Sequence, residues 1–325
     1  MGTEANPNIN SVIVSDEMSA NPAEMTIFSL IGVTIALVNI PVISIIFTSS
    51  ALKKCRELVL IGGICIVDAF LAMSNSVSAM DRLMRFPNGT IPNVSQMDCF
   101  FKYYVIFLFF ANMLVGISAL LVSLERFVVV FFPLKYMLSY TRTKGILIMI
   151  GCVFFCVLTL FVAYIYQTSV LNVEIFAMCY TAYVYPPIMA AFLVSVRTGT
   201  LGVSILLYLP ITLRICQIKL RSRKHVVHTS STHSSTHRLA FQTLSDQKKN
   251  IKFTVTIGLT CVSTLMFLFI PDLIINFNIF QLQSYHILFY RASLLKAVIN
   301  LFIYTLRHRE LRKELMLKLF YYHCG

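Results

Sequence analysis

Charged side chains are scarce in this chain of 325 residues, of which only 13% are Asp, Glu, Lys or Arg. Soluble domains average about 25% charged and roughly 45–50% apolar residues. Here 57% of the residues are hydrophobic. A disordered chain is excluded, because such chains are poor in hydrophobic residues. A water-soluble enzyme is disfavoured by the same composition, and we expect no catalytic activity.

Basic residues are absent from the first 25 residues, whose charges are all acidic. A secretory signal peptide begins with a basic stretch that leads into a short apolar one. Neither feature is present at the start of this chain. We therefore expect the first long apolar segment to direct insertion into the membrane.

Seven long apolar segments account for most of the chain. Each is near or above the roughly 20 residues that a helix needs to cross the hydrocarbon core. A lone strand would leave its backbone hydrogen bonds unmade in lipid, so each segment is expected to be helical. The predicted fold is all-α, a bundle of seven transmembrane helices. The segments cover residues 26–48, 58–80, 100–124, 145–166, 187–213, 252–275 and 287–305.

Basic residues are concentrated between particular segments. Of 27 Lys and Arg residues, 21 lie in 49–57, 125–144, 214–252 and the tail after residue 305. Because basic loops stay in the cytoplasm, this distribution predicts an outside N-terminus and a cytoplasmic tail. The net charge of +13 then faces the inner membrane surface and its lipids, and no nucleic-acid partner is expected. Two glycosylation sequons, at Asn88 and Asn93, fall in the predicted extracellular loop 81–98.

The inner end of the third segment carries a motif. Glu125-Arg126-Phe127 is followed by Pro133-Leu134-Lys135-Tyr136. This stretch resembles the D-R-Y…P-L-x-Y signature of rhodopsin-like G-protein-coupled receptors, with the same spacing. Further motifs occur in the family's order, and the resemblance covers nearly the whole chain. They are Asn39 and Asp68 in the first two segments, Phe269-Ile270-Pro271, which is similar to C-W-x-P, and Asn300-Leu301-Phe302-Ile303-Tyr304, which is similar to N-P-x-x-Y.

Several positions depart from the family pattern. Glu125 replaces Asp, Phe127 replaces Tyr, Leu301 replaces Pro, and Phe269 replaces a Trp. The chain has no Trp at all, so the fourth segment also lacks its usual one. With these departures the sequence is most similar to the divergent nematode serpentine chemoreceptors.

The resemblance implies a switch at the cytoplasmic face. Arg126 would pair with Glu125 at rest and move to a heterotrimeric G protein on activation, with Phe127 beside it. The alternative is an arginine that only extends to the membrane interface. Tyr208, Asn300 and Tyr304 would belong to the same switch, although Tyr208 is equally explained as an interfacial anchor.

Charges inside the predicted membrane region need partners, because a lone buried charge is costly. The resemblance implies that Asp68 binds a sodium ion beside Asn39 and Asn300. Lys296 lies four residues before Asn300, so both share one face of the seventh segment. We hypothesise that the Lys296 ammonium replaces the sodium as the partner of Asp68. The alternative is a lysine facing a water-filled cavity.

The resemblance places a ligand pocket among the third, fifth, sixth and seventh segments. Its mixture of apolar, aromatic and a few polar residues is typical of small-molecule sites. Arg197 and Asp272 either bind a polar ligand or pair with each other. Retinal and amine ligands are disfavoured, because Leu294 and Leu108 occupy the positions of their family anchors. The expected lining is Leu108, Phe109, Asn112, Phe192, Arg197, Phe269, Asp272, Asn276, Tyr290 and Ser293.

Most of the nine cysteines lie in apolar segments, where they are expected to pack as small hydrophobic residues. The resemblance implies one disulfide, between Cys99 and Cys179. Cys324 follows a basic amphipathic helix and is either palmitoylated or unmodified. The four histidines of 225–237 lack acidic or cysteine ligands, so neither a metal nor a cofactor is expected.

The sequence therefore predicts a multi-pass receptor of the plasma membrane. It would couple an extracellular small molecule to a heterotrimeric G protein, in contact with membrane lipid. A neuropeptide ligand is the alternative, and a transporter or membrane enzyme is disfavoured for want of a repeat or a clustered set of catalytic groups. The expected parts are an outer tail, 1–25; the receptor domain, 26–305, with its third cytoplasmic loop at about 215–250; and an amphipathic helix with its tail, 306–325.

Overall fold

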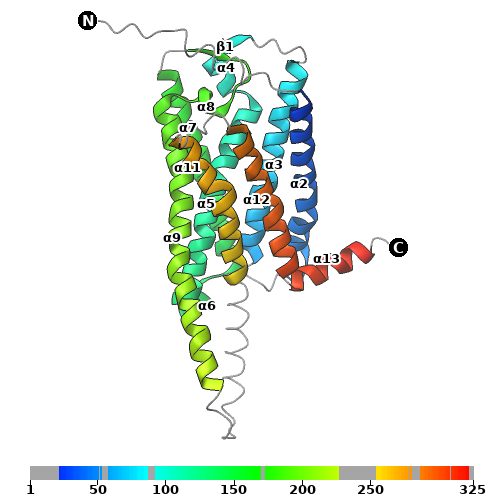
Figure 1. Cartoon of the computed structure of the whole chain (residues 1–325), viewed down its shortest axis with the longest axis vertical. Coiled ribbons are helices and arrows are strands. Elements are labelled where there is room, and N and C mark those ends of the chain that lie inside the picture. The colour runs from blue at the N-terminus through cyan, green and yellow to red at the C-terminus, as the bar shows by residue number, and fades with distance from the viewer. Residues whose placement is uncertain are drawn as a thin grey trace, which may run out of the picture.

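Long helices lie side by side in a single bundle in the computed structural model (Figure 1). The structure describes residues 22–50, 52, 58–86, 92–169, 173–226, 254–277, 279, 286–307 and 309–321. The helices of the bundle are α2 (Pro22–Thr48), α3 (Leu58–Arg85), α5 (Tyr103–Phe131), α7 (Arg142–Ser169), α9 (Pro187–Val226), a helical segment at 254–276 and α12 (His286–Arg307).

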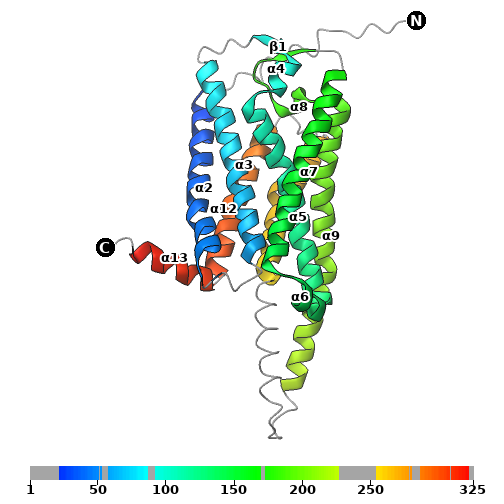
Figure 2. The same cartoon turned by 180° about the vertical axis from the view of Figure 1, so that it is seen from behind.

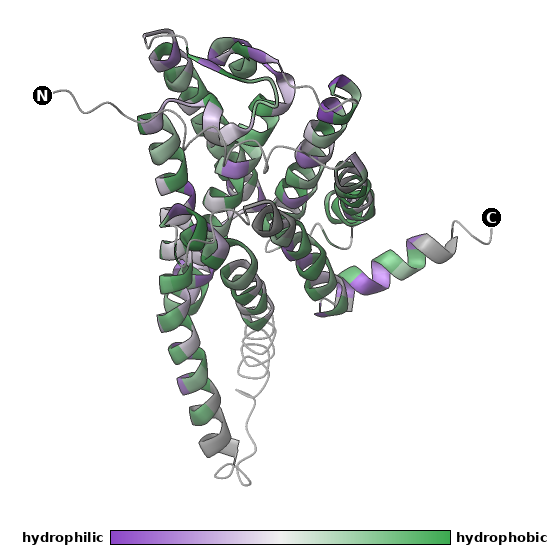
Figure 3. Cartoon of the chain, turned by 45° about the horizontal axis from the view of Figure 1, so that its top comes forward, coloured by the Kyte–Doolittle hydropathy of each residue, from purple (hydrophilic) through white to green (hydrophobic). Residues whose placement is uncertain are grey.

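Six helices of the described part of the chain are long and apolar enough to cross a membrane. They correspond to the first six predicted segments, and α12 coincides with the seventh. The architecture is that of an all-α, multi-pass membrane protein. The helices differ in how much of them is buried. In the most apolar stretch of α3, 72% of the residues are buried, whereas in that of α7 only 17% are, so α3 is an inner helix and α7 an outer one. The helices are coloured mostly as hydrophobic in Figure 3, and many of their large apolar side chains are exposed, which suits lipid as the solvent.

Two helices extend beyond the expected apolar segments. Residues 215–226, predicted as the start of a loop, continue α9 as helix to Val226. The last residues of the expected outer tail, from Pro22, already belong to α2. Hydropathy marks where apolar character ends, whereas a helix continues through polar residues as long as its backbone bonds are made.

Short elements close the two ends of the bundle, as Figure 2 shows from behind. We call one the α6 end, after α6 (Pro133–Ser139), and it also carries α13 (Arg309–Tyr321). The other, which we call the disulfide end, carries β1 (Asn93–Ser95), α4 (Gln96–Phe100), β2 (Glu174–Phe176) and α8 (Thr181–Val184). The two strands pair antiparallel, with Val94 opposite Ile175.

Helix α13 leaves the bundle at an angle and is tied to α2 (Figure 1). The Ser49 hydroxyl donates to Glu314 Oε2 at 3.0 Å, and Lys318 Nζ donates to Thr48 Oγ1 at 3.3 Å. Leu311 is completely buried, while the polar residues of α13 alternate with apolar ones along the helix in Figure 3. This arrangement fits a helix that lies along a membrane surface.

Glycines allow two pairs of helices to approach closely. A Cβ at Gly32 of α2 would lie 2.6 Å from the Ala72 carbonyl oxygen of α3. The hydroxyls of Ser29 and Ser76 bond across the same contact at 3.0 Å. Gly116 of α5 plays the same part against α9, where a Cβ would clash with Thr200. Small residues at such contacts are typical of helix packing in membranes.

The helical segment 254–276 contains one turn of π-helix, η2 (Leu265–Phe269), before α11 (Ile270–Asn276). The Ile270 N–H bonds to the Leu265 carbonyl, five residues back. Pro271 follows at once, and its ring excludes a regular turn because it would clash with a preceding carbonyl. The irregularity before Pro271 is therefore a π-bulge, whereas Pro210 lies within uninterrupted α-helix.

Candidate functional site

Arg126 lies at the α6 end of α5 and is completely buried. Its Nη2 is 2.6 Å and its Nε 3.0 Å from Glu125 Oε2. The other carboxylate oxygen, Oε1, accepts a hydrogen bond of 2.6 Å from the Tyr136 hydroxyl. A buried Arg–Glu pair is therefore joined to a tyrosine from the next element. Phe127 stacks on Phe131, with ring centroids 4.5 Å apart, and does not enter this polar group.

Tyr136 is positioned by the start of α6. Pro133 occupies the first turn of that helix, a position that requires no N–H donor. Burial and the neighbouring Glu125 carboxylate raise the pKa of Tyr136 far above its usual range, so its hydroxyl remains a donor at neutral pH. Tyr140 stacks on it at 4.8 Å, and burial raises the pKa of Tyr140 to about 12.

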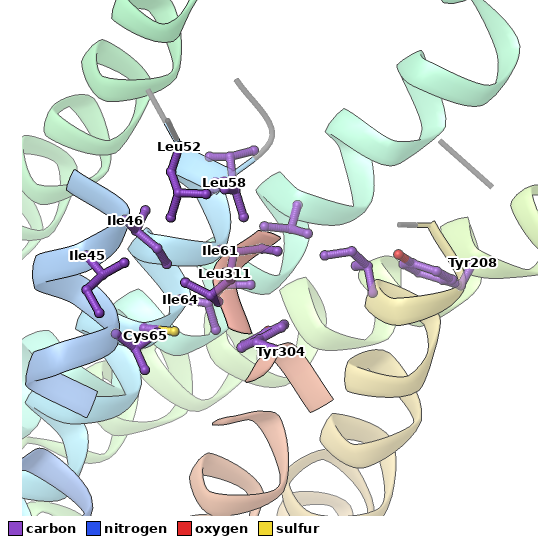
Figure 4. Packing of buried hydrophobic residues seen from close by; sticks show 14 residues of the cluster. Ile45, Ile46, Leu52, Leu58, Ile61, Ile64, Cys65, Tyr208, Tyr304 and Leu311 are labelled. Carbon is purple, nitrogen blue, oxygen red and sulfur yellow. The ribbon is translucent and has the colours of Figure 1, made fainter. Parts of the chain in front are cut away.

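A small polar cavity of about 30 Å³ lies in the bundle toward the same end. Tyr208 of α9 and Tyr304 of α12 both line it, and both are buried in the apolar cluster drawn in Figure 4. The Ser123 and Ser204 hydroxyls, also in its wall, bond to each other at 2.5 Å. The volume suits about one water molecule. The cavity therefore leaves room for limited rearrangement of the tyrosines.

Asp68 of α3 is bound by two side chains of α12. Lys296 Nζ lies 2.7 Å from Asp68 Oδ1, and Asn300 Nδ2 donates to Oδ2 at 3.0 Å. Asp68 and Lys296 are only 2% and 4% exposed, so this ion pair is shielded from solvent. Asn39, which the sequence grouped with them, is buried and donates to Ile35 of its own helix at 2.8 Å.

Arg197, Asp272 and Asn112 form a third polar group, which joins three helices. Arg197 Nε and Nη2 lie 2.8 and 2.9 Å from the two carboxylate oxygens of Asp272. Arg197 Nη1 donates to Asn112 Oδ1, whose own Nδ2 donates to Leu108 O at 2.8 Å. Of the two alternatives open from sequence, the structure has the pair, because the fork of Arg197 is filled by Asp272.

The other expected pocket residues are dispersed. Leu108, Phe109 and Ser293 are buried, while Phe192 and Asn276 are exposed. A Cβ at Gly202 would lie 3.4 Å from the Phe269 ring, so that ring packs against α9. The Tyr290 side chain lies outside the described residues. Of the nine expected residues whose side chains the structure describes, none lines the small polar cavity beside Tyr208, and none lines a larger cavity at the disulfide end, beside Lys102.

The Cys99–Cys179 disulfide is confirmed, with the two Cα atoms 5.3 Å apart. A second attachment of the same segment was not foreseen. Arg82 of α3 donates from Nε to the Met178 carbonyl at 2.8 Å and lies over the Tyr180 ring at 4.3 Å. The sequence shows only a basic residue near the end of the second apolar segment. The change from apolar to polar residues at the end of a membrane span explains that residue equally well.

Some of the predicted modification and metal sites lie in parts of the chain that the structure does not describe. Asn93 is exposed at the start of β1, whereas Asn88 and Cys324 lie outside the described residues. Most of the histidine-rich segment 225–237 lies outside as well. Within the described ranges, no group of three His, Cys, Asp or Glu side chains gathers in a way that would hold a metal ion.

No model of a known protein family matches the sequence, and no curated protein matches it either.

Proposed function

We propose that this chain is a rhodopsin-like G-protein-coupled receptor that converts the binding of an extracellular small molecule into activation of a heterotrimeric G protein. Its seven spans would cross the plasma membrane with the disulfide end outside and the α6 end inside. The observation that most supports this proposal is the Glu125–Arg126–Tyr136 group. In it, a completely buried arginine forms an ion pair with Glu125, which also accepts a hydrogen bond from Tyr136. The resemblance of the sequence motifs is the basis for naming this receptor family, and the geometry of the buried ion pair is consistent with it.

The local chemistry supports a two-state switch at the α6 end. A buried Arg–Glu pair is stable only while its surroundings keep both partners together, because separating them leaves an uncompensated charge. Opening of the α6 end would expose Arg126 to water and to an acceptor on the G protein. Ligand would favour the open form by binding it more tightly. The π-bulge before Pro271 provides an irregular point about which 254–276 would move.

The covering of the disulfide end favours a small molecule over a peptide. Strands β1 and β2 pair across this end, and Cys179, Val184 and Tyr185 are buried beneath or beside them. A peptide would need an open surface at that end. A small molecule needs only a local opening.

The test compares ligand-free coupling of wild type and Arg126→Ala to a panel of Gα subunits in cells, at matched surface expression. Arg142→Ala is the matched control, an arginine at the same end of the bundle that stands at the start of α7. We expect measurable basal coupling in wild type and in the control, and its loss in Arg126→Ala.

Equal coupling in all three chains would contradict the assigned role of Arg126. Tyr136→Phe provides a second, milder test, since it removes one donor from Glu125 without leaving a buried charge. We expect it to raise basal coupling, because the resting ion pair loses one of its supports.

A further inference from the structure

Two of the basic side chains near the disulfide end are held by contacts within the fold. Arg82 is held by the Met178 carbonyl and the Tyr180 ring. Arg197 has all three nitrogens directed at Asp272 and Asn112. Neither Arg82 nor Arg197 lines either of the two cavities described above, so these contacts hold both guanidiniums away from them.

Arg85 and Lys102 differ, because each keeps donors that are not used. Arg85 contacts Asp81 through Nε alone, at 2.8 Å, and its side chain is 45% exposed. Asp81 is itself held by the Tyr103 hydroxyl at 2.9 Å, which fixes the position of Arg85. Lys102 is half-buried, and its ammonium has no hydrogen-bond or ion-pair partner among the residues that the structure describes.

Both of these cations line the same cavity. Its volume is about 560 Å³, within the range of roughly 300–1,000 Å³ typical of small-molecule sites. The cavity lies between the end of α3, β1 and the start of α5, with Cys179 of the disulfide in its wall. Phe86 and Phe101 contribute aromatic surface, and Asp98 contributes one exposed carboxylate.

We propose that this cavity is a binding site for a small organic monoanion, such as a carboxylate with an apolar or aromatic body. The carboxylate binds the Lys102 ammonium and the unused Nη groups of Arg85. The apolar body lies against Phe86 and Phe101. Asp98 discriminates against dianions such as phosphate monoesters, because a second negative charge would face its carboxylate.

This site is separate from the ten residues first expected to form the ligand pocket. It concerns the ligand of the proposed receptor, yet binding to the purified chain requires no G protein. A failure of binding is therefore distinguishable from a failure of coupling.

The absence of tryptophan makes a direct binding measurement possible. An indole probe, excited where tyrosine does not absorb, emits without protein background. The fluorescence anisotropy of indole-3-acetate is titrated with the full-length chain purified in detergent. Indole-3-acetamide, which has the same shape without the charge, is the matched neutral probe. We expect saturable binding of the acid and at least about tenfold weaker binding of the amide.

Substitutions locate the site. Lys102→Met should weaken binding of the acid by about tenfold or more, since a charge-assisted contact is lost. Lys102→Arg should retain most of the affinity, and Asp98→Asn should leave it unchanged or tighter. Lys135→Met, an exposed lysine at the α6 end, is the control and should bind as wild type does.

The proposal is overturned by any of three results. These are the absence of saturable binding of indole-3-acetate; equal binding of the acid and the amide; and full affinity in Lys102→Met. Because the Lys102 ammonium has no partner among the described residues, its replacement breaks no hydrogen bond or ion pair among them. The thermal unfolding of each variant checks that point.

Discussion

At the scale of single residues, three cations within the described part of the bundle are each paired with one carboxylate. Glu125 holds Arg126 within one helix, whereas Asp68–Lys296 and Asp272–Arg197 each connect two helices. A buried pair contributes little net stability, but loss of one partner leaves an uncompensated charge. The two pairs that connect helices therefore specify which helix faces meet, more than they add to the free energy of folding.

Lys296→Ala should lower the free energy of unfolding by about 3–5 kcal/mol in potassium buffer, because Asp68 is left charged and buried. If the ammonium stands in place of sodium, sodium should restore part of this loss in the variant and have no effect on wild type. Thermal unfolding of the purified chain in sodium and potassium buffers measures both.

The double substitution Asp68→Asn with Lys296→Ala is the control, since it removes both charges. Its stability should exceed that of Lys296→Ala and show no preference for sodium. If wild type and Lys296→Ala respond identically to the two cations, the ammonium does not replace sodium.

At the scale of elements, contact between helices depends on where a side chain is missing. Gly116 lies where α5 meets α9, and an added Cβ would collide with the Thr200 hydroxyl and crowd the Arg197 backbone. Gly151 of α7 has nothing within 4 Å of the same hypothetical atom. The two helical glycines therefore differ only in their surroundings: Gly116 is crowded by a neighbouring helix, and Gly151 faces open space.

Gly116→Ala should therefore destabilise the bundle by about 1–3 kcal/mol, the usual cost of overpacking. Gly151→Ala should be neutral or stabilise it by up to about 1 kcal/mol, because alanine favours helix over glycine. Thermal unfolding of both variants in one detergent gives the comparison. Equal changes in the two would mean that the α5–α9 contact is looser than its geometry indicates.

At the scale of the whole molecule, the orientation in the membrane decides what each end meets. Asn93 is exposed on β1 at the disulfide end, as a glycosylated asparagine has to be. Cys99 and Cys179 are bonded at the same end, as suits an oxidising compartment. Lys318 and the other basic residues of α13 lie at the opposite end.

Glycan mapping tests this orientation. Asn93→Gln should remove one endoglycosidase-sensitive step from the mobility of the chain expressed in cells. Thr141→Asn creates a sequon with Arg142 and Thr143 at the α6 end, and it should remain unmodified. A glycan on the Thr141→Asn chain, together with no loss in Asn93→Gln, would reverse the orientation.

The sequence by itself determined the helices and their membrane character, because transfer of apolar side chains out of water and backbone hydrogen bonding are local properties. It also indicated that Lys296 and Asn300 share one face, since helical periodicity is local. It did not predict β1 and β2, because strands of three residues carry no periodic pattern. The helical continuation of α9 to Val226 was not predicted either, because the apolar character ends before the helix does.

Only the tertiary structure decided which partners these residues meet. The sequence left open whether Arg197 binds a ligand or Asp272, which lies 75 residues further along the chain. The contact of Arg82 with Met178, and the cavity beside Lys102, likewise depend on segments that approach only in the folded bundle. Periodicity defines the face on which a side chain lies. The packing of the other helices defines what occupies the space in front of it.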